Sequence, residues 1–135
     1  MLSVEELVEK GKEATKLSYS PYSHFAVGAA IELDDGKVIL GANVENASYG
    51  LSMCAERVAL YQMVMQGYTK DQVVQMIICC DCDDLPYPCG ACRQVISELM
   101  NKDALVTLIN LDKKTKSFTV EELLPYAFAE SDLNE

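Results

Sequence analysis

Three cysteines stand at positions from which they could bind one metal ion. Cys89 and Cys92 lie three residues apart at a predicted helix start, which places their sulfur atoms on one face with ~4.5 Å of helical rise between them. Two thiolates on one tetrahedral zinc ion lie about 3.8 Å apart, so this spacing suits a shared ion. Cys54 opens a second predicted helix. Three thiolates would leave the fourth zinc position open, which is typical of catalytic sites.

Two charged residues that follow Cys54 extend this chemistry. Glu56 is too close to Cys54 in sequence to bind the same ion comfortably, but it is well placed beside the open position to carry protons. Arg57 is positioned to offset the negative charge of three thiolates, because a guanidinium that donates to ligand sulfurs withdraws electron density from them. If both helices direct their N-termini to one point, their dipoles would also lower the pKa values of the thiols.

A mixed α/β fold is predicted to position these residues. Ser3 and Glu6 form a capping box that starts a helix over 3–18, and the sequence DDGK at 34–37 is a hairpin signal. The remaining pattern predicts helices over 54–65 and 89–100, a helical turn within 121–127, and strands over 26–33, 38–44, 73–80, 104–111 and 117–120. We therefore expect a five-stranded sheet sandwiched between helices. The last two strands should be antiparallel, because too few residues separate them for a parallel crossover.

Composition narrows the classes of function. The chain has 135 residues, which predicts a single domain over 1–135, and its net charge of −10 disfavours nucleic acid and anionic membranes as partners. The beginning of the chain lacks a signal-peptide pattern and no apolar run approaches the roughly 20 residues of a membrane span, so a cytoplasmic location is expected. Because His24 is the one histidine, a site that needs two imidazoles is excluded, and we assign this residue to a loop.

Three further cysteines lie just before the Cys89 helix. An even total of six cysteines is compatible with disulfides, but a cytoplasmic protein more often uses cysteine for metal binding or as a buried thiol. Cys79 and Cys80 end an apolar strand, where cysteine is an ordinary core residue. Cys82 can be either exposed or packed, and the sequence assigns no role to these three thiols.

The order C-x-E followed by P-C-x-x-C resembles the three-cysteine form of the zinc-dependent nucleobase deaminase pattern. Longer segments, from about residue 18 to residue 128, resemble the small homotetrameric cytidine deaminases. These segments are FAVGAA (25–30), NVENA (43–47), CAER (54–57) and PCGACRQV (88–95).

The resemblance implies a site and a reaction. Cys54, Cys89 and Cys92 would hold one zinc ion per chain, and zinc-bound hydroxide would attack C4 of cytosine while catalytic Glu56 moves protons to N3 and to the departing amine. The products would be uridine or deoxyuridine and ammonia, as in pyrimidine salvage. The same match implies substrate contacts from Asn43 and Glu45 (ribose hydroxyls), Phe25 (base), Ala55, and Phe128, which would reach a neighbouring subunit's site in a homotetramer.

Other functions stay open at this point. A related deaminase could act on another aminonucleoside, such as a nucleoside antibiotic, but the Asn43 and Glu45 pair favours a ribose. A non-catalytic zinc domain would not need an open fourth ligand position with Glu56 beside it. A thiol oxidoreductase built on Cys89 and Cys92 would work without metal and would not depend on Glu56. Cytidine and deoxycytidine are not distinguished by the sequence.

Overall fold

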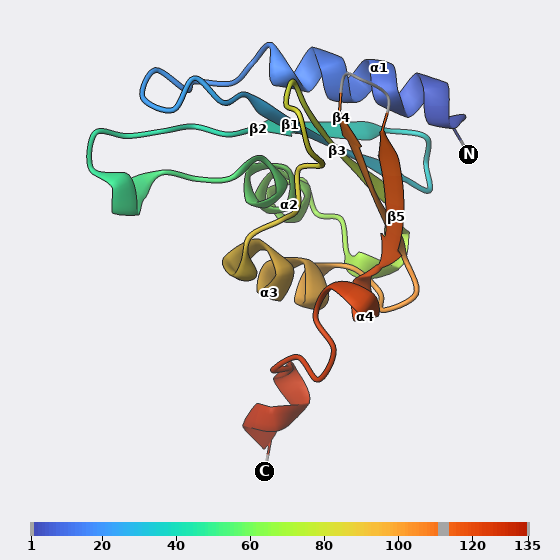
Figure 1. Cartoon of the computed structure of the whole chain (residues 1–135). Helices are drawn as coiled ribbons and strands as arrows, with labels where there is room; N and C mark the ends of the chain where they lie inside the picture. The colour runs from blue at the N-terminus through green and yellow to red at the C-terminus, as the bar shows by residue number, and fades with distance from the viewer. Residues whose placement is uncertain (1, 111–113, 135) are drawn as a thin grey trace.

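A five-stranded sheet forms the centre of the computed structural model, which describes residues 2–110 and 114–134 (Figure 1). The strands lie in the order β2-β1-β3-β4-β5. Their bounds are Val27–Leu33 (β1), Val38–Ala42 (β2), Val73–Cys80 (β3), Leu105–Asn110 (β4) and Thr115–Thr119 (β5), and the helices are α1 (Val4–Thr15), α2 (Ala55–Met65), α3 (Gly90–Leu99) and α4 (Val120–Leu123). Short 3₁₀ turns occupy Tyr49–Leu51, Lys70–Gln72 and Glu130–Asn134.

The strand directions confirm the predicted mixed sheet. β1 pairs antiparallel with both β2 and β3, and β4 pairs antiparallel with β5, as expected for the last two strands. β3 and β4 are parallel, with α3 as the connection between them. Because α3 follows the carboxyl end of β3, its N-terminus lies at the edge of the sheet where open α/β proteins bind ligands.

Helices cover both faces of the sheet, as predicted. Figure 1 shows α1 on one face and α2 and α3 on the other. The larger apolar core lies under α2 and α3, where Ile31 of β1 packs with Leu60 and Ile96. The smaller core lies under α1, where Leu7 packs with Ile77 of β3. Alternate residues of β1, β3 and β4 therefore enter different cores. Among the described residues, no helix is long and apolar enough to cross a membrane.

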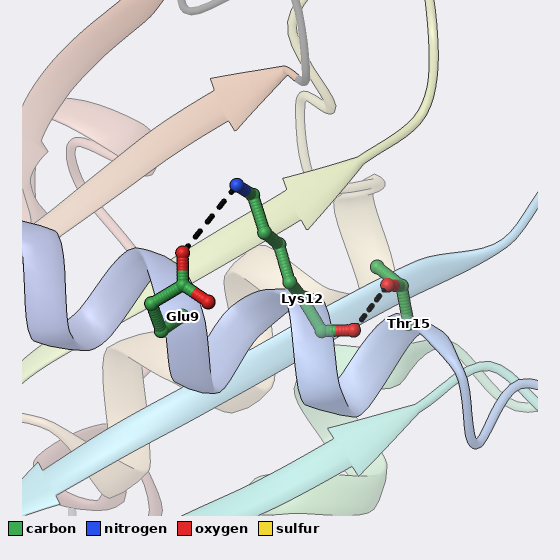
Figure 2. Close-up of polar contacts among 3 residues, drawn as sticks. All are labelled: Glu9, Lys12 and Thr15. Carbon is green, nitrogen blue, oxygen red and sulfur yellow. Dashed lines mark hydrogen bonds and ion pairs between the residues drawn. The ribbon is translucent and has the colours of Figure 1, made fainter.

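Polar side chains lie on the exposed face of α1 toward the C-terminal end of the helix. Lys12 Nζ lies 3.5 Å from a carboxylate oxygen of Glu9, and the Thr15 hydroxyl donates to the Lys12 carbonyl oxygen over 2.6 Å (Figure 2). Exposed ion pairs of this kind add little stability. The helix begins with the predicted Ser3 cap, whose hydroxyl accepts from the Glu6 amide, and it is held to the sheet by its buried face.

Two predicted elements near the N-terminus are longer than the observed ones. The helix predicted over 3–18 ends at Thr15, because the chain then turns so that Tyr19 can pair with Val44. Leu17, the last apolar residue of the predicted stripe, is exposed as a result. The strand predicted over 38–44 ends at Ala42, so the two polar residues of the NVE sequence leave the sheet. Leu111, the predicted last residue of another strand, lies outside the described residues.

The C-terminal segment departs from prediction in three details. β5 covers Thr115–Thr119 and not 117–120, because the Thr119 hydroxyl caps α4 and starts that helix at Val120. α4 ends at Leu123 and does not fill 121–127, since the residue before Pro125 avoids helical backbone. The acidic composition of residues 130–135 predicts a solvated, frayed end. Residues 130–133 are exposed, but Glu130–Asn134 forms a 3₁₀ turn, beside which the Ala129 amide donates to an Asp132 carboxylate oxygen.

Close packing of α2 against β2 fixes the helix that carries the catalytic candidates. A Cβ atom on Gly41 would lie 2.5 Å from the carbonyl oxygen of Ala55 and from the amide nitrogen of Ala59. Such a distance is far below van der Waals contact, so only glycine allows the helix to approach this strand so closely. This close contact fixes the position of the first turn of α2 relative to the sheet.

Candidate active site

The three predicted metal ligands converge from the N-termini of two helices. Cys54 is the N-cap of α2 and Cys89 is the N-cap of α3, while Cys92 lies in the first turn of α3. Cys92 is buried, Cys54 is partly buried and Cys89 is exposed. The positive ends of two helix dipoles therefore surround the three sulfur atoms and favour their thiolate forms.

The spacing of the sulfur atoms fits a zinc ion. The Sγ atoms of Cys54 and Cys89 are 3.8 Å apart, and all three Sγ atoms lie within 4.8 Å of one another. Thiolates at ~2.3 Å from a tetrahedral zinc ion are separated by about 3.8 Å, so little movement is needed to bind it. Three soft sulfur donors select zinc over magnesium or calcium. The cysteine cluster can thus hold zinc and leave one coordination position free.

Protonation within the cluster is unequal. The Cys92 thiol, with Arg57 and Cys89, lowers the pKa of Cys54 to about 5, and this effect exceeds the opposing effect of burial. The pKa of Cys92 is raised, first by its hydrogen bond with the Cys54 sulfur and then by burial. The cluster therefore favours the thiolate form of Cys54, which is the form that binds a metal cation.

Arg57 lies against the cluster, where the sequence placed it. Its Nη2 atom is 3.5 Å from the Cys54 sulfur, and this contact raises the pKa of the guanidinium above its already high value. The Nε atom of Arg57 is buried and has no hydrogen-bond partner among the described residues. A permanent positive charge beside sulfur ligands offsets their negative charge and stabilises the thiolate forms.

Glu56 is a buried carboxyl group beside the cluster. Only 4% of the residue is exposed. Burial raises the pKa of this carboxyl, and the negative charge of Cys54 raises it further. A carboxyl whose pKa moves toward neutrality can both accept and release protons at working pH. The arrangement therefore provides an acid–base group that is separate from the three sulfur ligands.

Two short bridges bring the predicted ribose segment to this cluster. Val44 pairs antiparallel with Met53, the residue before Cys54, through hydrogen bonds of 3.0 and 2.8 Å. Val44 also pairs in parallel with Tyr19, since the Tyr19 amide donates to Asn43 and the Glu45 amide donates to Tyr19. The segments 19–25, 43–45 and 53–56 are consequently adjacent, although they are far apart in sequence.

The Asn43 side chain is already hydrogen-bonded within the protein. Its Oδ1 accepts from the Ser18 hydroxyl at 2.6 Å and from the Val27 amide at 2.9 Å. Its Nδ2 donates to the Phe25 carbonyl oxygen at 2.8 Å, which leaves one N–H free. Asn43 can therefore donate one further hydrogen bond, in an orientation that its three protein contacts determine.

Glu45 is held just as firmly. One carboxylate oxygen accepts from the amides of Tyr22 and Ser23, each at 3.1 Å, and the other accepts from the Ser23 hydroxyl. These bonds, with the Ser23 hydroxyl as the largest contribution, lower the pKa of Glu45. A carboxylate has about four acceptor positions, so one stays available for a ligand hydroxyl group.

The remaining predicted substrate contacts lie in different environments. Phe25 is 43% exposed, on the loop that leads into β1. Ala55 is fully buried at the start of α2, where the N–H groups of the first turn have no acceptor within the helix. Phe128 is 58% exposed and lies after α4, on the segment that projects from the body of the molecule (Figure 1).

Two residues of α3 anchor the site in ways that the sequence interpretation missed. The Nε atom of Arg93 donates to the Pro88 carbonyl oxygen at 2.9 Å, just before Cys89, and its Nη1 donates to the Leu123 carbonyl oxygen at the end of α4. Gln94 donates to the Phe128 carbonyl oxygen at 2.9 Å. Their position one turn after a helix-capping ligand is a signal for such a role, because side chains of that turn reach back over the N-terminus.

The other cysteines lie outside the cluster. Cys79 and Cys80 are fully buried, which confirms their prediction as core residues. The structure pairs Cys80 with Cys82 sulfur to sulfur across the turn that follows β3, a pairing that the sequence interpretation as thiols did not anticipate. Cys82 itself is partly buried.

Comparison with known proteins gives the family. Residues 1–108 match the model of the cytidine and deoxycytidylate deaminase zinc-binding region. The cytidine deaminase of Halalkalibacterium halodurans is 46% identical over 129 residues, which cover 96% of each chain. The chain belongs to the cytidine deaminase family. The cytidine deaminase of Sporosarcina psychrophila is 40% identical over 98% of this chain and 96% of its own length.

Solved structures of the family share the fold. The structure of cytidine deaminase from Burkholderia pseudomallei superposes with a TM-score of 0.91 at 42% identity, over 94% of this chain and 100% of that chain. Cytidine deaminase from Mycobacterium tuberculosis gives a TM-score of 0.79 at 34% identity, over 95% and 98%. These comparisons confirm the predicted family and fold class. The cysteine cluster lies within the region that the family model describes as zinc-binding.

Proposed function

We propose that this protein is a zinc-dependent hydrolase that converts cytidine and deoxycytidine into uridine and deoxyuridine, with release of ammonia, in pyrimidine salvage. The observation that carries the proposal is the buried Glu56 carboxyl beside a three-cysteine cluster that leaves one zinc position free. Relatives named cytidine deaminase over almost the full chain support it. The basic test is to measure zinc content and the ultraviolet change on conversion of cytidine by the purified protein.

The cluster cysteines, Glu56 and Arg57 have different roles in the reaction. Zinc, when bound by Cys54, Cys89 and Cys92, supplies Lewis acidity that makes water a nucleophile at neutral pH. Glu56 takes one proton from the attacking water and delivers it to N3 of the ring. It then carries the remaining proton of the new C4 hydroxyl to the exocyclic nitrogen, and the C4–N bond breaks to release ammonia. Arg57 limits the negative charge of the cluster, so that the site retains its acidity.

Substrate selection is assigned to the loops beside the cluster. Asn43 and Glu45 are proposed to bind the ribose hydroxyls through the donor and acceptor positions left free by their protein contacts. Phe25 is proposed to pack against the base, and Ala55 to contribute its backbone N–H. The charge of Glu45 favours an uncharged nucleoside, because a carboxylate attracts hydroxyl donors and repels phosphate.

Nucleosides should be much better substrates than nucleotides. In a side-by-side assay at equal concentration, cytidine and deoxycytidine should turn over well, whereas cytidine 5′-monophosphate and single-stranded oligonucleotides should be poor. The physical reason is the Glu45 carboxylate in a chain of net charge −10. The measurement is kcat/KM for each compound, and a preference for cytidine monophosphate would overturn the nucleoside assignment.

We also propose a homotetramer with shared active sites, in the cytoplasm. A groove of about 350 Å³ runs along β2 and α2, and none of its lining residues belongs to the cysteine cluster. Tyr61, Val64 and Met65 expose apolar side chains on the same helix, which is a pattern typical of a protein interface. The cluster can bind zinc only while Cys54, Cys89 and Cys92 are reduced, and a reducing compartment such as the cytoplasm keeps them so.

Phe128 should act in the site of a neighbouring subunit. Phe128→Ala should keep its zinc but raise KM about tenfold, as expected when ~1.4 kcal/mol of aromatic contact is lost. Mixing this variant with Glu56→Ala protein should form hybrid sites that combine an intact Glu56 with an intact Phe128, and these sites should recover the parent KM. Light scattering should show a tetramer, and a fully active monomer would contradict the shared site.

A further inference from the structure

We propose that Ser23 is a positioning residue for nucleoside binding, whose hydroxyl couples the ribose-binding carboxylate of Glu45 to the base-packing loop at Phe25. This inference rests on the proposed function, because it takes the substrate to be a nucleoside that Glu45 binds through its sugar. The contacts between Ser23 and Glu45 span 22 residues of sequence.

The contacts of Ser23 with Glu45 are made by both backbone and side chain. The Ser23 amide donates to one carboxylate oxygen at 3.1 Å, and the Ser23 hydroxyl donates to the other. Two donors from one residue define the plane of the carboxylate and leave a predictable acceptor position free. A third donor, the Tyr22 amide, comes from the same loop.

The same hydroxyl also binds the loop that carries Phe25. The oxygen of Ser23 accepts from the Phe25 amide at 3.0 Å, while the Phe25 carbonyl oxygen accepts from Asn43 at 2.8 Å. The peptide groups on both sides of Phe25 are therefore held, one by the Ser23 hydroxyl and the other by Asn43, which is proposed to bind the ribose. The hydrogen bond to Glu45 uses the single proton of the hydroxyl, and the bond from the Phe25 amide uses one of its two lone pairs, so the two contacts together define its orientation.

The backbone between Ser23 and Phe25 is strained in a way that supports this role. His24 adopts a φ of 56°, in the left-handed region that non-glycine residues rarely occupy. Its amide donates to the Ser20 carbonyl oxygen at 3.0 Å, which closes the turn. Strain of this kind persists only where surrounding contacts determine the conformation, and it concentrates at ligand-binding sites. Here the contacts are those of Ser23, Glu45 and Asn43.

The consequence for binding is that the sugar and base contacts are organised together before substrate arrives. Without the Ser23 hydroxyl, Glu45 keeps its two backbone donors but loses its hydroxyl donor, and the Phe25 amide loses its acceptor. Glu45 and Phe25 must then be ordered when the nucleoside binds, and the entropy lost in that step weakens the affinity for the nucleoside. The cysteine cluster and Glu56 are not changed. Ser23 should therefore affect KM and leave kcat largely unchanged.

The test is Ser23→Ala, with KM and kcat measured for cytidine and for 2′,3′-dideoxycytidine. We expect KM for cytidine to rise about 3- to 10-fold, as for the loss of one hydrogen bond, with kcat within about twofold of the parent. Ser23→Thr, which keeps a hydroxyl, should restore most of the affinity. The dideoxy compound lacks the sugar hydroxyls that Glu45 would bind, so its KM should rise less than that of cytidine.

The pH dependence of KM separates positioning from a general loosening of the loop. The Ser23 hydroxyl lowers the pKa of Glu45, and the charge of His24, the ionisable neighbour, lowers it as well. Removing the hydroxyl raises this pKa toward its ordinary value. As pH falls, the KM of Ser23→Ala should therefore begin to rise at a higher pH than the KM of the parent. Ser48→Ala, at a residue that makes no capping hydrogen bond, should match the parent.

The outcomes distinguish this inference from the proposed function. If Glu45→Ala raises KM at least about 10-fold while Ser23→Ala changes neither KM nor its pH dependence, Ser23 has no positioning role and the ribose assignment stands. If Glu45→Ala has no effect and the parent binds cytidine and dideoxycytidine equally, the ribose assignment itself is wrong. A fall in kcat alone for Ser23→Ala would also overturn the inference.

Discussion

Replacing Glu56 with glutamine should abolish nearly all deamination while leaving the zinc in place. The expected loss in kcat is at least the roughly 10²- to 10⁴-fold typical of general acid–base catalysis, and larger if one carboxyl performs several transfers. The amide has the size of the carboxyl but cannot exchange protons. The protein should fold normally, because burial raises the pKa of Glu56 and so already disfavours its charged form. The measurements are kcat for cytidine, zinc per chain and the melting temperature.

Glu98 provides a matched control for this variant. It is an exposed glutamate on α3, so Glu98→Gln removes one carboxyl without touching the cluster. That variant should keep the parent kcat. Turnover near the parent value in Glu56→Gln would remove Glu56 from the mechanism, and loss of zinc from it would show that Glu56 is needed to hold the metal.

Substituting any one of the three cluster cysteines with alanine should empty the metal site and eliminate activity. Two thiolates and two open positions bind zinc far more weakly than three thiolates, and the loss of metal removes the nucleophile. Cys92→Ala should also lower the melting temperature of the purified protein, because metal that binds only the folded state stabilises it. Zinc per chain, measured by atomic spectroscopy, checks this prediction.

The cysteines outside the cluster serve as controls. Cys79→Ala, Cys80→Ala and Cys82→Ala should each retain the metal, since Cys79 is a separate core residue and the other two pair with each other. Full zinc occupancy in Cys89→Ala would contradict the ligand assignment. Thiol–disulfide exchange activity that survives metal removal and the Glu56 substitution would instead support the oxidoreductase alternative.

Local sequence determined the elements and the chemistry of the metal centre. The Ser3 capping box, the turn before Lys37 and the apolar runs of the strands predict structure because their signals come from neighbouring residues. The spacing of Cys89 and Cys92 fixes their geometry in the same way, since one turn of helix sets the separation of their sulfur atoms. Antiparallel pairing of β4 with β5 follows from the short connection alone.

Only the tertiary structure decided which distant segments meet. The approach of Cys54 to Cys89 depends on two helices packing on one face of the sheet, which the close contact at Gly41 permits. The burial that raises the pKa of Glu56 comes from the same packing, and no property of residues 54–57 encodes it locally.

The loop contacts of the proposed substrate-binding residues also could not be predicted from local sequence. The Val44 bridges and the hold of Ser23 on Glu45 join segments more than 20 residues apart, so their register depends on the whole sheet. The end of α1 at Thr15 has the same origin, because pairing of Tyr19 with Val44 overrides a helical pattern that continues to Leu17. Helix propensity contributes a few tenths of a kcal/mol per residue, which is too little to resist such pairing. The sequence thus predicted the groups of the metal centre, and long-range packing decided which further residues join them and where each group points.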